Sequence, residues 1–159
     1  MRSESYTCFV EIFEKQTELA PYTNVMFPKT MNELSINGEW PSLENSVIEE
    51  LIAQEFWSEG KCEDQVNVLY VKVSGNWVRL YFDYSIIFWR SGDNGVHDEG
   101  ADRSMYPLID LGAQLGVVGN KITSCVGSLI DGGAQVKFKF SGGQSLTVQS
   151  INDATLIKT

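Results

Sequence analysis

The chain has 159 residues, a formal net charge of −9 at neutral pH, and hydrophobic residues at 43% of its positions. This length allows one domain with a sizeable buried core, so we expect a single domain over residues 1–159, and the composition is not that of a disordered segment. The acidic balance disfavours nucleic acids and anionic membranes as partners, because both carry negative charge.

The N-terminal segment contains no apolar run typical of a signal peptide, and no stretch has the length of a membrane span. Cys8, Cys62 and Cys125 are odd in number and widely spaced, which argues against a disulfide framework or a zinc motif. We therefore expect a cytoplasmic protein whose cysteines are small buried apolar residues. Residues 7–14, TCFVEIFE, fit either a first strand or a short helix.

The stretch from Ser42 to about Trp57 predicts an amphipathic helix. Ser42 is a typical N-cap and Gly60 a typical C-terminal stop. Glu49 and Glu50 lie on the side of this helix opposite to its apolar arc. The arc is formed by Leu43, Val47, Ile48, Leu51 and Ile52. We expect this helix to pack on a sheet.

Residues 66–83 predict a β-hairpin with Gly75-Asn76 as a two-residue turn. This register places three apolar pairs on one buried face: Val73 with Val78, Val71 with Leu80, and Leu69 with Phe82. The other face pairs Tyr70 with Tyr81 and Lys72 with Arg79. Two opposed cations repel each other, so we expect a carboxylate near them.

The remaining chain predicts further strands. Residues 86–90 form either a strand or a bent extension of the preceding strand, residues 91–107 form a polar loop that Pro107 closes, and residues 122–130 form another strand. Residues 108–121 are ambiguous, because glycines interrupt leucines at helical spacing.

A second hairpin is predicted near the C-terminus, from VKFKF at 136–140 and SLTVQSI at 145–151. We expect a three-residue loop, Gly142 to Gln144, because an odd loop keeps the apolar partners on one face. The expected pairs are Phe138 with Val148 and Phe140 with Leu146. Residues 155–159 add a last short strand.

The stretch SGDNGVHDEGADRS, residues 91–104, is the most distinctive candidate site. Read as a calcium loop that starts at Asp93, it places Gly95 at the third position and His97 at the fifth, so the EF-hand pattern fails. His97 is the chain's only histidine, which leaves a transition-metal site without a second imidazole. We expect neither a metal site nor a cofactor.

No sequence motif identifies a reaction. There is no GxSxG elbow, no Walker A loop and no GxGxxG loop. We expect no catalytic residues and therefore a protein that is not an enzyme.

The acidic side chains are concentrated in two segments. Residues 39–64 carry eight acidic and one basic residue, and residues 91–106 carry four and one. Such segments suit a basic protein partner, and aromatic residues beside them are typical anchors of protein interfaces. The predicted partner-binding residues are Asp93, Asp98, Glu99, Asp102, Glu49, Glu50, Trp57, Trp89 and Tyr106.

The ending VKFKFSGGQSLTVQSINDATLI, together with the acidic single domain, resembles small stand-alone bacterial immunity proteins of polymorphic and contact-dependent toxin systems. The segment that carries the resemblance is residues 136–157. It implies a non-enzymatic inhibitor that binds a cognate toxin, often a basic nuclease, and blocks its active site or an essential surface. These proteins share no binding motif, so the resemblance implies no site residue.

Together these patterns predict an α+β fold, with a mostly antiparallel twisted β-sheet and at least one amphipathic helix packed on it. The predicted function is to bind and neutralise a cognate basic toxin in the cytoplasm, without nucleic acid or membrane as a partner. The alternative is a small enzyme or small-ligand-binding domain whose pocket has no signature in the sequence.

Overall fold

The structure is a computed structural model that describes residues 33–159. The segment 7–14 and Cys8 lie outside the described residues. Contacts within residues 32–159 make this part of the chain one compact unit.

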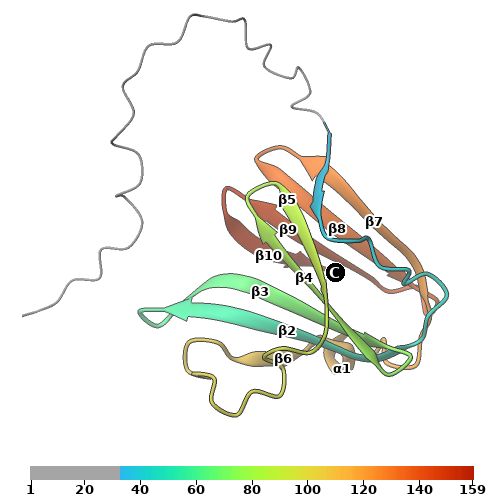
Figure 1. Cartoon of the computed structure of the whole chain (residues 1–159), viewed down its shortest axis with the longest axis horizontal. Helices are drawn as coiled ribbons and strands as arrows, with labels where there is room; N and C mark the ends of the chain where they lie inside the picture. The colour runs from blue at the N-terminus through green and yellow to red at the C-terminus, as the bar shows by residue number, and fades with distance from the viewer. Residues whose placement is uncertain (1–32) are drawn as a thin grey trace, which may run out of the picture. The chain divides into compact units, whose positions relative to one another are not determined.

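Two packed β-sheets form this unit (Figure 1). The six-stranded sheet has the order β1-β5-β4-β3-β2-β6 and the four-stranded sheet the order β10-β9-β8-β7. The strands of the first sheet are β1 (Ser35–Asn37), β2 (Ile48–Ser58), β3 (Lys61–Val73), β4 (Asn76–Asp83), β5 (Ile86–Ser91) and β6 (Leu108–Asp110). Those of the second are β7 (Ile122–Ile130), β8 (Gly133–Phe140), β9 (Ser145–Ile151) and β10 (Ala154–Lys158).

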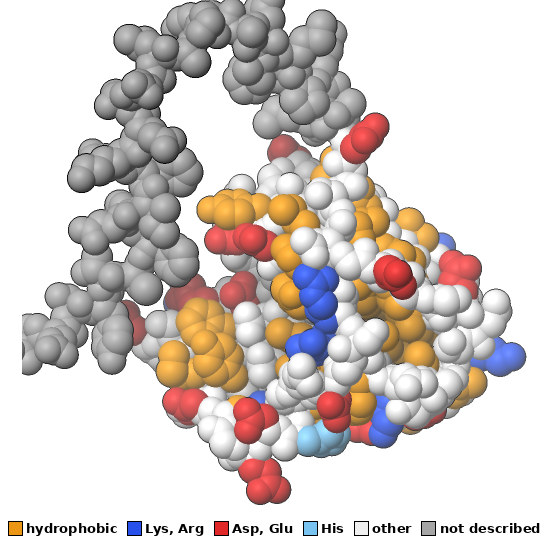
Figure 2. Space-filling model, in the orientation of Figure 1, with side chains coloured by type: hydrophobic (Ala, Val, Ile, Leu, Met, Phe, Trp, Pro, Cys, Tyr) orange, Lys and Arg blue, Asp and Glu red, His pale blue; other side chains and the backbone are white. Residues whose placement is uncertain are grey.

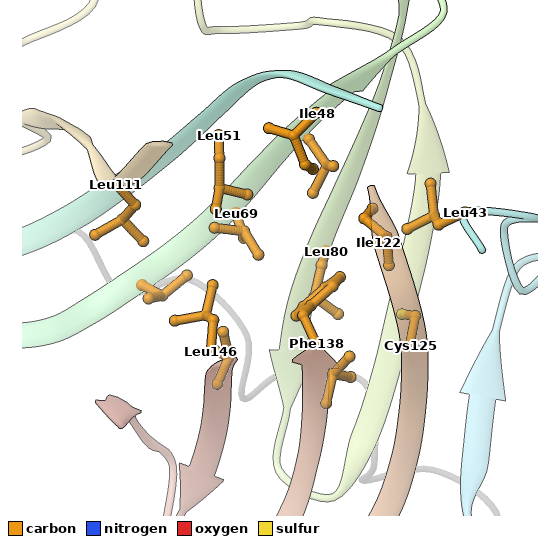
Figure 3. Close-up of a cluster of buried hydrophobic side chains, with 14 of the residues drawn as sticks. Leu43, Ile48, Leu51, Leu69, Leu80, Leu111, Ile122, Cys125, Phe138 and Leu146 are labelled. Carbon is orange, nitrogen blue, oxygen red and sulfur yellow. The ribbon is translucent and has the colours of Figure 1, made fainter. Parts of the chain in front are cut away.

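The hydrophobic core lies between the two sheets, where side chains from both meet (Figure 3). Leu69 and Leu80 of the first sheet, and Phe138 and Leu146 of the second, are each 0% exposed. The ring of Phe138 lies 6.5 Å from that of Trp89 on β5, which joins the sheets directly. This core is what holds the two sheets face to face.

The expected α+β class is wrong, because the structure of residues 33–159 is nearly all β. The only helix in this range is α1 (Leu111–Leu115), five residues long. Residues 48–58, expected in the amphipathic helix from Ser42 to Trp57, form the strand β2 instead. Among residues 33–159, no helix has the length and apolar composition needed to cross a bilayer.

A β-bulge explains why β2 resembles a helix in sequence. The pairing of β2 with β3 shifts between Ile48 and Glu50, which inserts one extra residue into β2. Ile48 and Leu51 both face the core, and because of the extra residue they are three positions apart instead of two. Ile52 contributes to a small apolar cluster on the opposite face of the sheet. Burial on both faces therefore produces adjacent apolar residues, as in a helix.

The β3–β4 hairpin exists, but its turn is one residue earlier than expected. Ser74 and Gly75 form the turn, with φ of 51° and 74°, and positive φ at both central residues is typical of a type I′ turn. The expected pairs are therefore wrong by two residues, although the buried face is unchanged. The observed pairs are Val73 with Asn76, Lys72 with Trp77, Val71 with Val78, Tyr70 with Arg79, and Leu69 with Leu80.

The β8–β9 hairpin has the expected odd loop, displaced by one residue to Ser141–Gly143. Within it, the Phe140 amide donates to the Gln144 carbonyl at 3.0 Å, and the Gly143 amide to the Phe140 carbonyl at 3.0 Å. The register is shifted accordingly, so Phe138 pairs with Leu146 and Val136 with Val148. Strands β5, β7 and β10 confirm the strands expected at 86–90, 122–130 and 155–159.

Candidate functional site

The segment between β5 and β6, residues 92–107, is the acidic loop, and it packs on the outer face of the six-stranded sheet. Val96 is 8% exposed and joins a small apolar cluster with Tyr70 and Trp77. The hydroxyl of Tyr70 donates to the carbonyl oxygen of Asn94 at 3.3 Å. The acidic loop is therefore anchored to the sheet through the buried side chain of Val96.

Arg103 holds the acidic loop together from within. Its Nη2 donates to the carbonyl oxygens of Gly95 and Asp98 at 2.9 and 3.0 Å. Longer bonds of 3.4 Å join its guanidinium to the carbonyl oxygens of Val96 and Tyr106. One side chain thus satisfies backbone acceptors at both ends of the loop, which restricts the conformations that the loop can adopt.

The carboxylates of the acidic loop are exposed and ordered by local hydrogen bonds. Asp98 Oδ1 accepts from the Gly100 amide at 2.9 Å, and Asp102 Oδ1 accepts from the Ser104 amide and hydroxyl at 3.0 and 2.6 Å. The bonds from Ser104 lower the pKa of Asp102 below its ordinary value, so its carboxylate stays ionised at neutral pH. Glu99 is exposed beside them.

An aromatic patch, defined as Phe56, Trp57, Met105 and Tyr106, joins the end of β2 to the C-terminal part of the acidic loop. The rings of Phe56 and Tyr106 are stacked with centroids 5.4 Å apart, and the Trp57 amide donates to the Met105 carbonyl at 2.8 Å. The amides of Met105 and Tyr106 both donate to the Asp102 carbonyl. Figure 2 shows hydrophobic side chains gathered over this end of β2 and β3, with acidic side chains around them.

Lys72 links the acidic residues of β2 to the acidic loop. Its ammonium lies 2.8 Å from Glu50, and this hydrogen bond is the main cause of its raised pKa, with Glu49 and Asp93 adding to the effect. Glu49 also accepts from the Gly75 amide of the β3–β4 turn at 2.9 Å. A carboxylate does lie beside Lys72, but the expected reason for it is wrong, because Lys72 pairs with Trp77 and not with Arg79.

The predicted residue Trp89 does not lie on this surface. It is 2% exposed and its ring packs edge-on against Trp40, with centroids 5.4 Å apart, inside the core. Trp89 is therefore a core residue and is not accessible to a partner. Trp57 and Tyr106 are half-buried, which leaves part of each ring accessible.

Three residues of this surface have no counterpart in the sequence-based prediction: Phe56, Met105 and Arg103. Phe56 and Met105 are sequence neighbours of the predicted Trp57 and Tyr106, and Met105 is 40% exposed. Arg103 is the one basic residue of the stretch 91–104, which is the only signal in the sequence for its role.

His97 is exposed, and its ring lies 5.9 Å from that of Trp77. In residues 33–159, no group of three or more histidine, cysteine, aspartate or glutamate side chains could hold a metal ion. A hollow of about 280 Å³ lies within the acidic loop. It is lined by Val96, His97, Asp98, Glu99, Arg103 and Leu108.

Two open hollows flank Trp40 at the other side of the sandwich. The edge hollow, of about 380 Å³, is lined by Trp40, Pro41, Ser42, Leu43, Glu44 and Cys125. The second, of about 480 Å³, is lined by Gly38, Glu39, Trp40, Pro41, Ser42, Val78, Trp89, Arg90 and Ser91.

No protein-family model matches the chain, and no curated protein or solved structure matches it.

Proposed function

We propose that the protein binds a basic protein toxin through the acidic loop and the aromatic patch and neutralises it in the cytoplasm, as an immunity protein does. The observation that carries this proposal is the contact between the two features. Ionised carboxylates and partly accessible aromatic rings form one continuous surface around Asp102, Met105 and Tyr106.

Such a surface has the composition of a protein-binding site. Interface hot spots are enriched in tryptophan and tyrosine, and the charged residues around them steer a partner of opposite charge. Charge is distributed unevenly along the described chain: residues 33–118 carry fifteen acidic and five basic side chains, whereas residues 119–159 carry two and four. The part that contains the acidic loop is therefore the part that attracts a basic partner.

The order of the acidic loop also supports the proposal. A flexible loop loses conformational entropy when it binds, and this loss weakens binding. The bonds from Arg103 and the packing of Val96 remove much of that freedom before a partner arrives. A rigid acidic loop therefore binds a rigid basic surface at a lower entropic cost.

A small-ligand-binding function is the alternative, and the hollow of about 480 Å³ beside Trp40 has a volume typical of ligand sites. The cationic side chain that lines this hollow, Arg90, already donates hydrogen bonds within the protein. Arg90 donates from Nη1 to the carbonyls of Asn37 and Trp89 at 2.9 and 2.7 Å, and from Nη2 to Asn37 Oδ1 at 2.7 Å. Because these bonds occupy the guanidinium, the hollow supports the alternative less well than the acidic loop supports a protein partner.

The test of the proposal is a triple replacement of Asp98→Asn, Glu99→Gln and Asp102→Asn. We expect slower association with the toxin and a weaker dependence of that rate on salt, because exposed interface charges act mainly on encounter. Stability should change by no more than about 0.5 kcal/mol per substitution, as is usual at exposed positions. The measurement is stopped-flow binding at several ionic strengths, with the protein partner recovered from cells of the source organism.

A matched control changes the net charge by the same amount at distant turns: Asp83→Asn, Asp131→Asn and Asp153→Asn. All three positions are exposed and outside the acidic loop. Equal rates for the two triple variants would show that only net charge matters and would contradict the proposed surface. If no protein that binds the unmodified chain is recovered from those cells, the proposed function is contradicted.

A further inference from the structure

The four edges of the two sheets are protected unequally. Strands β1 and β6, at the edges of the six-stranded sheet, are only three residues long. Strand β10 is covered by side chains of β3, because the amides of Thr155 and Ile157 donate to Asp64 Oδ1 and Gln65 Oε1, both at 2.8 Å. Short strands and covered edges are the usual protections against unwanted strand pairing.

Within residues 33–159, strand β7 has neither protection along residues 124–130. Its nine residues, ITSCVGSLI, include no charged residue and no proline, and Val126 at its centre is 53% exposed. It pairs with β8 on one side. On its other side, residues 124–130 pair with no strand of the described chain. This is a long, uncharged edge with backbone groups available to another strand.

The first residues of β7 already accept a neighbouring segment on that free side. The Asn45 amide donates to the Ile122 carbonyl at 2.8 Å, the Ile122 amide donates to the Ser46 carbonyl at 2.9 Å, and Val47 forms an antiparallel bridge with Lys121. Residues 40–44, which precede this bridge, line the edge hollow together with Cys125 of β7.

The edge hollow combines an apolar lining with one carboxylate. Trp40, Pro41, Leu43 and Cys125 supply the apolar side chains, and Glu44 supplies the charge. Burial, together with the nearby Glu44 carboxylate, raises the pKa of Cys125 to about 12, so its thiol stays neutral. A side chain with an apolar stem and a cationic end fits this lining, because its stem can contact Trp40 while its charge reaches Glu44.

We propose that the free edge of β7 binds an extended segment of a basic protein partner, which adds to the four-stranded sheet and places a lysine or arginine side chain in the edge hollow. The inference rests on the proposed function only for the identity of the partner. Main-chain hydrogen bonds to residues 124–130 supply affinity, and Glu44 selects for a cation.

The test uses the full chain and a blocked synthetic peptide in which lysine and valine alternate. We expect the peptide to shift and protect the amide signals of residues 124–130 in NMR and hydrogen-exchange measurements. The same peptide with alternate backbone amides methylated should bind at least about tenfold more weakly, because it cannot complete the hydrogen-bond ladder. Equal binding of the methylated peptide, or shifts confined to the acidic loop, would overturn the inference.

Three variants test the edge hollow. Glu44→Gln should weaken peptide binding about two- to fivefold, the value expected for one exposed ion pair. Ser42→Trp should abolish binding by filling the hollow from an exposed position, whereas Ser85→Trp, exposed in the β4–β5 turn, should leave binding unchanged. If Ser42→Trp and Ser85→Trp bind the peptide equally, the hollow is not the site.

Sedimentation of the peptide-free protein separates a foreign strand from a second copy. A concentration-dependent dimer that protects residues 124–130 would overturn the inference in favour of self-pairing. If the peptide binds but no toxin partner is found, only the proposed function is contradicted, because the peptide assay contains no toxin. A confirmed toxin partner without peptide binding would contradict only this inference.

Discussion

Replacing Phe138 with alanine is expected to lower the free energy of unfolding by about 3–5 kcal/mol, the range measured when a large buried aromatic is removed. Phe138 is 0% exposed and lies between the sheets, where its ring contacts those of Trp89 and Phe140. The loss combines the transfer free energy of the ring with the cavity that remains, because both sheets are held by the strands around them. Denaturant unfolding followed by circular dichroism measures the change.

The control is Lys137→Ala, at the preceding position of β8. Lys137 is exposed on the outer face of the same strand, so its replacement should change stability by no more than about 0.5 kcal/mol. If both variants lose the same free energy, the assignment of inner and outer faces in β8 is wrong.

The strands that could be predicted from sequence are those in which the order of apolar and polar residues follows only from alternation between the core face and the solvent face of a sheet. Strand β8 alternates between core and surface from Val136 to Phe140, and glycine marks the turns at Gly75 and Gly143, both at positive φ. The registers could not be predicted, because Ser74 adopts a positive φ that sequence reasoning assigns to glycine or asparagine. The β3–β4 turn therefore lies one residue earlier than expected, and its pairs differ by two residues.

The helix expected at Ser42 to Trp57 failed for a different reason. A bulge after Ile48, combined with burial of Ile52 on the second face, reproduces helical spacing within a strand. The spacing of apolar residues alone cannot distinguish an amphipathic helix from a bulged strand that is buried on both faces, because both place apolar residues three and four positions apart. The long pairing of β2 with β3, which spans Ile48 to Ser58, decides the outcome.

The acidic surface was partly predictable, since exposed carboxylates in a glycine-rich stretch can be recognised by type. Its organisation was not, because Arg103 binds backbone carbonyl oxygens, and every residue type has one. Closeness in sequence also misled the prediction for Trp89. This residue adjoins the acidic loop in sequence, but the alternation of side chains along β5 directs its ring into the core.

Replacing Arg103 is expected to release the acidic loop without unfolding the sandwich. Arg103→Ala removes the donors to the carbonyl oxygens of Gly95, Asp98, Val96 and Tyr106. Hydrogen bonds from charged groups contribute about 1.5–3 kcal/mol, so the loop amides should exchange with solvent at least about tenfold faster. The measurement is hydrogen exchange resolved to single amides.

Exchange of the core strands serves as the internal control, since Leu69 and Leu80 are held by the packing of the two sheets and not by Arg103. Arg103→Lys should protect the acidic loop only in part, because an ammonium is a point charge and cannot match the fork of a guanidinium that serves acceptors at both ends of the loop. Unchanged loop exchange in Arg103→Ala would contradict the organising role of Arg103. Equal acceleration in the loop and in β3 would contradict it as well, because it would show global rather than local opening. If the loop is released alone, binding of the proposed basic partner should weaken mainly through faster dissociation, because a partner must then order a loop that Arg103 orders in advance.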